Sequence, residues 1–133
     1  EIAPALLRTG VSEARLCSEI CTAMLDRGAM GISRFNQPAA EDVLGVASFS
    51  ENSLRAAALD SPSGTVGTCI AMKSIGSSER TLRQGDTVLL DIPCGMYGYH
   101  TDKSITFYFG ALRDHPQGDL IREARAQCVF LEN

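Results

Sequence analysis

The sequence predicts an α+β fold in which α-helices cover an antiparallel β-sheet. Apolar residues recur at helical spacing between residues 12 and 27, and again from about residue 119 onward. Residues 85–110 contain two runs rich in β-branched and aromatic residues, separated by a turn that two glycines bound, which indicates a β-hairpin. At 133 residues the chain is long enough for one domain with a hydrophobic core.

The first long helix is expected to begin after Ser12, whose side chain suits an N-cap. Residues Glu1–Arg8 resemble the tail of an earlier helix that Gly10 closes. The long helix should run to Arg27, with Gly28 as its C′ residue. Its predicted buried face contains Leu16, Cys17, Ile20, Ala23 and Met24. We expect this helix to be a scaffold that covers the sheet.

The middle of the chain predicts two short strands and a long loop. The strands are expected near Ile32–Phe35 and Val43–Ser50. The loop, Glu51–Glu79, is rich in Ser, Gly, Ala and Thr and contains a turn signal, Asp60-Ser61-Pro62-Ser63-Gly64. Because so long a loop in a compact domain usually has a function, we place it near the mouth of a cleft.

The C-terminal part predicts a loop through residues 114–118 and then a last helix. This helix is expected to run from about Asp119 to Asn133. Its apolar residues at helical spacing are Leu120, Ile121, Ala124, Cys128 and Leu131.

The predicted hairpin brings two carboxylates together. If Met96 and Tyr97 form its tip, residues equally distant from the tip pair across the strands, and Asp91 lies opposite Asp102. Their Cβ atoms would then be about 5 Å apart. Two anions in apolar strands repel each other and are costly to bury. A divalent cation between them explains the pair, because hard cations such as Mn²⁺ and Mg²⁺ prefer oxygen ligands.

Other interpretations of the two aspartates remain open on geometry alone. The register of the strands could slip, one aspartate could face water, or one could pair with Lys103 or with an arginine elsewhere. The two carboxylates could also share one proton. His100 would share the strand face of Asp102, but a surface or core role is favoured over a ligand role. His115, in an Asp-His-Pro turn, is expected to be solvent-exposed.

Composition excludes several classes of partner. The net charge of −4, the pI near 5.1 and the scattered Lys and Arg argue against a nucleic acid or a membrane as partner. Five cysteines with no C-x-x-C pair do not form a disulfide framework, and Cys17 with Cys21 is expected to pack in the core. Such thiols fit a reducing compartment. No signal peptide and no membrane-spanning apolar run is visible, so we expect a cytoplasmic location.

Several segments carry a resemblance to a known family. They are Leu7-Arg8-Thr9-Gly10-Val11-Ser12-Glu13, Ser50-Glu51-Asn52-Ser53, Gly76-Ser77-Ser78-Glu79-Arg80 and, most specifically, Leu82-Arg83-Gln84-Gly85-Asp86-Thr87-Val88-Leu89-Leu90-Asp91, continued by Gly98-Tyr99-His100-Thr101-Asp102. From Leu6 onward the chain resembles the pita-bread metallopeptidases: methionine aminopeptidase, aminopeptidase P and prolidase, with creatinase as a relative. In that family an Asp after a Gly-Asp strand is a metal ligand, and a second Asp ligand follows eleven residues later. Asp91 and Asp102 match both ligands.

The resemblance implies part of a pita-bread fold and a site for two divalent metal ions, Mn, Co or Zn. Asp91 would be the bidentate ligand of one ion and Asp102 would bridge both. One His and two Glu would come from a second, pseudo-symmetric half outside this chain, so residues 1–133 are expected to be the N-terminal portion of a catalytic domain truncated at both ends. The metal pair would supply a hydroxide that attacks a peptide carbonyl. The segments at residues 50–52 and 97–99 would be scaffold.

Three departures from the family pattern qualify this expectation. Ile105 follows Ser104 where relatives carry a cation, and no substrate-contacting His is present around Ile70-Ala71-Met72. The chain contains only His100 and His115. The ligands expected from the second half could not be replaced by Glu51, Glu79 or Glu123 without an unusual fold.

The expected function of the intact protein is metal-dependent hydrolysis of short peptides, of the Xaa-Pro aminopeptidase or dipeptidase type. The alternative is a catalytically inactive module that binds a peptide or protein, which Ile105 favours. A metal-free, creatinase-like hydrolase is a third reading, against which the presence of both aspartates argues. The isolated 133 residues should be inactive and should associate into a homo-oligomer through an exposed apolar edge.

Overall fold

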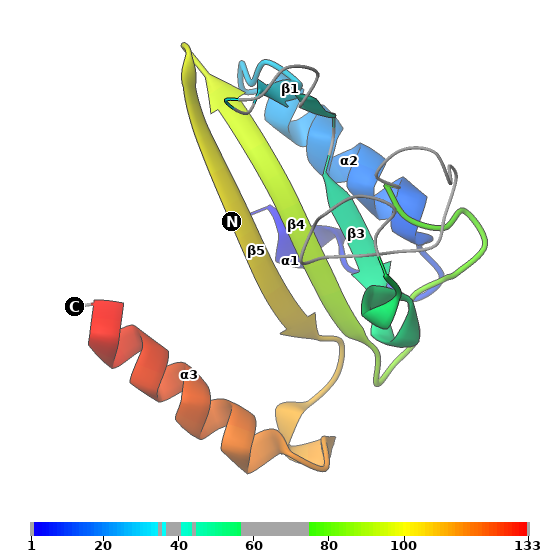
Figure 1. The fold of residues 1–133 in the computed structure, drawn as a ribbon. Helices are drawn as coiled ribbons and strands as arrows, with labels where there is room; N and C mark the ends of the chain where they lie inside the picture. Colours follow the sequence, from blue (N-terminus) through cyan, green and yellow to red (C-terminus); the bar gives the residue numbers. More distant parts are fainter. Residues whose placement is uncertain (1, 35, 37–40, 44, 57–74, 133) are drawn as a thin grey trace.

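A computed structural model of the chain describes residues 2–34, 36, 41–43, 45–56 and 75–132, without the side chains of residues 41–43 and 127–132. Its central feature is an antiparallel sheet with helices α1 and α2 packed on one face (Figure 1). This arrangement confirms the predicted α+β class.

Helix α2, Glu13–Leu25, is the scaffold helix that the sequence predicts. Ser12 is its N-cap, and the Ser12 hydroxyl accepts a hydrogen bond from the Arg15 N–H at 3.2 Å. At the other end, Gly28 has a φ of +89° and its N–H donates to the Leu25 carbonyl, while Ala29 N–H donates to the Met24 carbonyl. This is the Schellman arrangement with Gly28 at C′, as expected.

Helix α1, Ala3–Leu6, is a four-residue helix that ends before Gly10. The prediction that Gly10 closes it is wrong. Gly10 has a φ of +85° and instead donates its N–H to the Leu82 carbonyl at 2.9 Å. It therefore turns the chain toward the segment that precedes the hairpin, and into α2.

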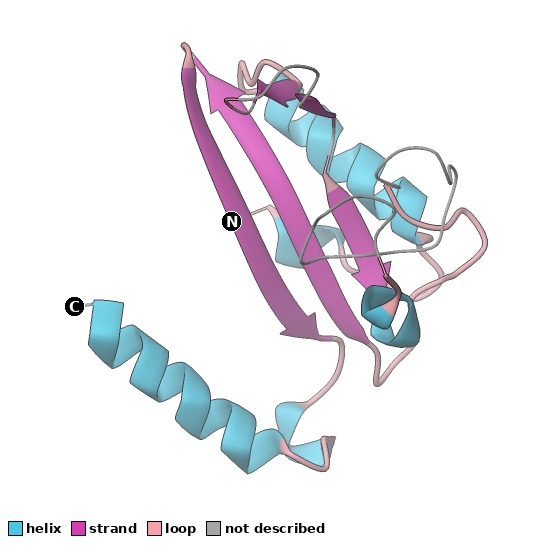
Figure 2. Ribbon diagram, in the orientation of Figure 1, coloured by secondary structure: helices cyan, strands magenta, loops and turns pink. Residues whose placement is uncertain are grey.

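The sheet has the order β3-β4-β5, with every neighbouring pair antiparallel (Figure 2). Strand β3 is Val46–Phe49, β4 is Thr87–Met96 and β5 is Tyr99–Tyr108. A separate two-stranded ladder joins β1, Ile32–Arg34, to β2, Glu41–Val43. Of the predicted strand Val43–Ser50, only Val46–Phe49 form β3, because Val43 ends β2 and Ser50 begins a 3₁₀ helix. The predicted end of the first strand at Phe35 lies outside the described residues.

The hydrophobic core lies between α2 and one face of the sheet. Its members are Val11, Leu16, Cys17, Ile20, Cys21, Ala47, Phe49, Leu82, Val88 and Leu90. Leu16, Phe49, Leu82 and Val88 are fully buried. The cysteines Cys17 and Cys21 belong to this core, which confirms their predicted packing role.

The hairpin turn lies one residue later than the sequence suggested. Met96 pairs with Tyr99, so Tyr97 and Gly98 form the two-residue turn, with φ of +52° and +84°. Positive φ at both central residues is the type I′ geometry that suits the twist of a two-residue hairpin. Placing the tip at Met96 and Tyr97 was therefore wrong, because Gly98 is needed inside the turn and not beside it.

The remaining elements flank the sheet. The 3₁₀ helix η1, Ser50–Leu54, follows β3, and the 3₁₀ helix η2, Leu112–Asp114, follows β5. Helix α3, Gly118–Glu132, is the predicted last helix and extends away from the sheet (Figure 1). Most of the predicted loop Glu51–Glu79 lies outside the described residues. Within the part of the chain described, no helix has the length and apolarity to cross a membrane.

Candidate metal site on the β4–β5 hairpin

Asp91 and Asp102 share one face of the hairpin but do not lie directly opposite each other. Asp91 pairs with Ser104, and Asp102 pairs with Pro93. The true register differs by two positions from the expected one. Because side chains alternate with a period of two, this shift moves the partners and keeps both carboxylates on the same face. They are diagonal neighbours, which lie about 7–8 Å apart, with somewhat shorter distances between their Cβ atoms.

This face is the one that points away from α2. Val88 and Leu90 of β4 belong to the core under α2, and Asp91 has the opposite parity along the strand. Asp91 is only 6% exposed, whereas Asp102 is exposed. The carboxylate of Asp91 is thus buried, while that of Asp102 is accessible to solvent.

The buried carboxylate has a donor on the neighbouring strand. The Ser104 hydroxyl donates a hydrogen bond to Asp91 Oδ1 at 2.5 Å. The partner that the ladder gives to Asp102 is Pro93, which has no N–H and no side-chain donor. The two aspartates therefore have different environments on the same face.

Two carboxylates on one face of adjacent strands suit a hard divalent cation, which prefers oxygen ligands. They are only part of a site, because a catalytic metal ion usually has three or more protein ligands. In the described ranges, no group of three or more His, Cys, Asp or Glu side chains could hold a metal ion. Asp91 and Asp102 could hold such an ion only together with further ligands.

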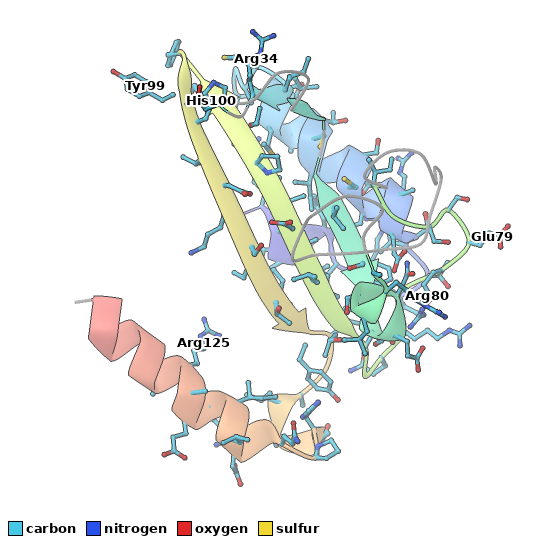
Figure 3. The ribbon with its side chains drawn as sticks, in the orientation of Figure 1. Arg34, Glu79, Arg80, Tyr99, His100 and Arg125 are labelled. Carbon is cyan, nitrogen blue, oxygen red and sulfur yellow. The ribbon has the colours of Figure 1, made fainter. Side chains whose placement is uncertain are left out.

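Of the other candidate residues, His100 shares the face of Asp102 two positions along β5, while Ile105 and Lys103 have the parity of the opposite face. His100 pairs with Gly95 at the turn end of the hairpin, where its side chain is exposed (Figure 3). Ile105 pairs with Leu90 and Lys103 with Ile92, so both have the parity of the α2-covered face. A cation at position 105 would therefore not face the aspartates, which weakens the significance of Ile105.

His115 is half-buried, so the prediction of a solvent-exposed side chain was wrong. Its ring packs edge-on against Tyr108 with centroids 5.0 Å apart. Its Nδ1 accepts a hydrogen bond from the Gln117 N–H at 3.1 Å. These contacts give it a structural role in the turn between η2 and α3.

Gly45 lets the chain approach the backbone of Asp91 closely. A Cβ at this position would lie 2.5 Å from the Asp91 carbonyl oxygen and 2.8 Å from Pro93 Cδ, and the φ of Gly45 is +74°. Both the space and the backbone conformation require glycine. Gly45 therefore helps to fix the position of β4 at the candidate ligand.

A buried carboxylate that the sequence reasoning missed holds the surroundings of the sheet together. Glu13, in the first turn of α2, is 0% exposed. One of its oxygens accepts the Phe49 N–H at 2.6 Å, and the other accepts the Ser77 N–H at 2.7 Å and Asn52 Nδ2 at 2.5 Å. Burial raises the pKa of Glu13, and these hydrogen bonds oppose the rise without cancelling it. The residue joins α2 to β3, η1 and the segment before β4.

A second missed carboxylate, Asp86, orders the start of β4. Its oxygens accept hydrogen bonds from the Ser50 hydroxyl at 2.8 Å, from the Arg80 guanidinium at 2.7 Å and from the Arg83 N–H at 2.7 Å. Burial alone would raise the pKa of Asp86, but these donors hold it below its usual value. Arg80 lies at the end of the molecule near η1 (Figure 3).

Both missed carboxylates lie inside segments that the sequence had singled out. Glu13 directly follows an N-cap serine, and Asp86 follows the glycine that opens the hairpin. Their partners Ser50 and Asn52 therefore have structural hydrogen bonds, in line with the expected scaffold role of these two residues. Both could have been identified in the sequence as charged residues beside an apolar run. If such a residue is buried, hydrogen-bond donors must surround its carboxylate.

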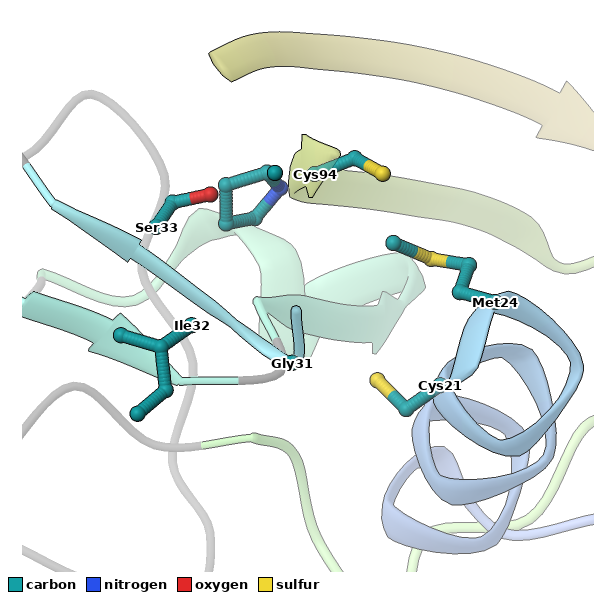
Figure 4. A pocket seen from close by; sticks show the side chains of 8 residues that line it. Cys21, Met24, Gly31, Ile32, Ser33 and Cys94 are labelled. Carbon is teal, nitrogen blue, oxygen red and sulfur yellow. The ribbon is translucent and has the colours of Figure 1, made fainter. Parts of the chain in front are cut away.

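A small hollow lies where the end of α2 meets β1 and β4 (Figure 4). Its volume is about 10 Å³, which is room for about one water molecule. Residues lining it include Cys21, Met24, Ser33 and Cys94. Ser33 Oγ is buried and has no hydrogen-bond partner in the described part of the chain. The hollow is far too small for a peptide substrate.

Comparison with known proteins connects this arrangement to a family. The sequence profile of metallopeptidase family M24 matches residues 1–129. No curated protein and no solved structure matches the chain. The family comprises metal-dependent peptidases that use divalent ions, and the antiparallel sheet with its helices agrees with that fold. The match covers nearly the whole chain and agrees with the resemblance to pita-bread enzymes, so the chain belongs to metallopeptidase family M24.

Proposed function

We propose that the intact protein hydrolyses short peptides whose second residue is proline, as an Xaa-Pro aminopeptidase or dipeptidase, and that Asp91 and Asp102 are metal ligands. The observation that supports the metal-ligand role most strongly is the placement of both carboxylates on one face of the hairpin, away from α2. Because the chain belongs to a metallopeptidase family, these two carboxylates are suited to act as ligands of its metal ions.

The two aspartates would have different tasks. Asp91, set into the sheet and hydrogen-bonded to Ser104, would supply a fixed carboxylate for one ion. Asp102, exposed on the same face, would bridge that ion and a second one. Two divalent ions, Mn, Co or Zn, would supply a bound hydroxide and polarise the scissile carbonyl. The remaining ligands would come from residues outside this chain.

The test compares Asp102→Asn with Asp114→Asn in the intact protein. Asp114 is an exposed aspartate outside the hairpin, so its variant controls for the loss of one surface charge. Hydrolysis of an Xaa-Pro dipeptide, an Xaa-Pro-Xaa tripeptide and matched Xaa-Ala peptides is measured with added Mn²⁺, Co²⁺ or Zn²⁺. We expect Asp102→Asn to lose activity and Asp114→Asn to keep it. Unchanged activity in Asp102→Asn would refute the proposal, and equal rates on Xaa-Ala peptides would refute the proline preference.

The second candidate is an inactive peptide-binding module. It is favoured by the absence of a third metal ligand near Asp91 and Asp102 within the described residues. Isothermal titration with the same peptides in a chelator separates the two functions. Peptide affinity that persists without metal, together with no hydrolysis in any metal, would favour the module.

The buried thiols suggest where the protein acts. Cys17 and Cys21 are both buried and form no disulfide, and a hydrogen bond with Cys17 lowers the pKa of Cys21. Because such thiols persist in a reducing environment, we propose a cytoplasmic location. Fractionation of the source cells tests it.

A further inference from the structure

We propose that Ser104 is a positioning residue that fixes the carboxylate of Asp91 for metal binding. This inference rests on the proposed function, because it concerns how the chain prepares one ligand of that site. Ser104 is the direct partner of Asp91 in the β4–β5 ladder, and its hydroxyl reaches Asp91 Oδ1 at 2.5 Å.

The need for such a residue follows from the freedom of an aspartate side chain. The terminal torsion of aspartate is broad, so the backbone of β4 alone does not decide which way the carboxylate plane faces. A hydroxyl on the neighbouring strand can set this plane, because the ladder fixes the strand on which the hydroxyl is carried. Partners of this kind orient metal ligands, and their removal typically costs about 10–100-fold in metal affinity.

The chemistry of the donor also suits a ligand. A hydroxyl is neutral, so it directs one oxygen of Asp91 without compensating the negative charge that attracts a cation. Asp86 shows the contrast, since Arg80 forms a 2.7 Å ion pair with it. The hydrogen bond from Ser104 thus orients one oxygen of Asp91 without adding a positive charge of its own.

The same face of the sheet carries a buried serine, Ser48, whereas Ser104 itself is exposed. Ser48 of β3 pairs with Leu89, two residues before Asp91, and so has the parity of the Asp91 face. Its Oγ is buried without a hydrogen-bond partner in the described part of the chain. The serines on the two strands that flank β4 thus differ. Ser104 on β5 donates a hydrogen bond to Asp91, whereas Ser48 on β3 does not. The directed contact to Ser104 is therefore not a general feature of serines on this face.

The simpler explanation is that Ser104 only satisfies a buried carboxylate and stabilises the fold. The matched pair Ser104→Thr and Ser104→Val separates the two roles. Threonine and valine have nearly the same shape and both favour strands, so the pair differs in the hydroxyl. Thr106→Val on the same strand and face is the control, because Thr106 pairs with Leu89 and not with an acidic residue.

The measurement is Mn²⁺ affinity of the intact protein, by isothermal titration and by the electron paramagnetic resonance signal of free Mn²⁺, with melting temperature in chelator as a fold check. We expect Ser104→Val to lose affinity about 10–100-fold. Ser104→Thr should stay close to wild type, as should Thr106→Val. At saturating Mn²⁺, the peptidase activity of Ser104→Val should recover.

Each outcome decides a different question. Equal Mn²⁺ affinity in Ser104→Val and Ser104→Thr would overturn the positioning role, as would a Thr106→Val loss as large as that of Ser104→Val. If Asp102→Asn still lowers affinity in that case, only this inference fails and the proposed function stands. Mn²⁺ binding that is absent in wild type, or independent of Asp91 and Asp102, would overturn both.

Discussion

Replacing Glu13 should destabilise the fold more than replacing any exposed acid of the chain. Its carboxylate is fully buried and accepts three hydrogen bonds, two of them from backbone N–H groups, those of Phe49 and Ser77. These groups belong to β3 and to the segment that precedes β4 along the chain. The removal of one side chain therefore leaves donors without partners on two separate segments.

The size of the effect follows from counting the donors. A buried donor that loses its partner costs about 1–3 kcal/mol. Glu13→Ala abandons two backbone donors, so we expect a loss of about 2–6 kcal/mol in the free energy of unfolding, a large fraction of the roughly 5–15 kcal/mol of a typical domain. In Glu13→Gln the remaining carbonyl oxygen can keep the Ser77 and Asn52 contacts, while the new amide faces the Phe49 N–H. That variant should lose about 1–3 kcal/mol.

The assay is urea denaturation at neutral pH, followed by far-ultraviolet circular dichroism. The control is Glu51→Gln on η1, where the side chain is exposed and a change within about 0.5 kcal/mol is expected. An unchanged m-value would show that the shift in midpoint reports stability. If Glu13→Gln lies within 0.5 kcal/mol (roughly the surface-mutation range) of the Glu51→Gln control, the reasoning that a hub of three donors stabilises this region is refuted.

Four further predictions follow from the structure. Tyr97 is 88% exposed and has a φ of +52°, so Tyr97→Asn should raise stability by about 0.5–1 kcal/mol in urea denaturation, because asparagine tolerates this conformation. Gly45→Ala should displace the Asp91 backbone and lower both the melting temperature and Mn²⁺ affinity; an unchanged affinity would count against the close approach. The pKa of Asp86 is lowered in the folded state, so its contribution is present above its unfolded pKa and is lost as the pH falls through the folded one; Asp86→Asn should flatten the acid limb of stability against pH. The 133-residue chain alone should self-associate in light scattering over a concentration series, because Ile105, Leu120 and Ile121 are exposed on β5 and α3.

The sequence predicted elements whose signals are local. Ser12 and Gly28 marked the two ends of α2, because an N-cap and a C′ glycine act through hydrogen bonds within a few residues. The hairpin was predicted for the same reason. Its register was not, since a turn bounded by Gly95 and Gly98 left the placement of the tip open, and only positive φ at Tyr97 and Gly98 decides it.

The candidate site was predicted in part because successive side chains of a strand alternate between the two faces of the sheet. A register error of two residues preserves which face each side chain takes, so Asp91 and Asp102 stayed together although their direct partners changed. An error of one residue would have put one partner on the opposite face. Glu13 and Asp86 could not be identified in this way, because their donors come from segments up to 64 residues away in the chain.

Glu13, Asp86, Asp91 and Asp102, four acidic residues in or beside the β3-β4-β5 sheet, differ in the donors that surround them. Glu13 receives N–H donors from three segments, and Asp86 receives a guanidinium, a hydroxyl and an N–H. Donors of that number and charge leave a carboxylate little capacity to bind a cation. Asp91 is instead directed by a neutral hydroxyl across the ladder, and Asp102 faces solvent opposite a proline. The aspartates that the sequence assigned to metal binding thus share the face that the β4–β5 register gives them. The two carboxylates that it missed instead join α2, β3, η1 and the start of β4.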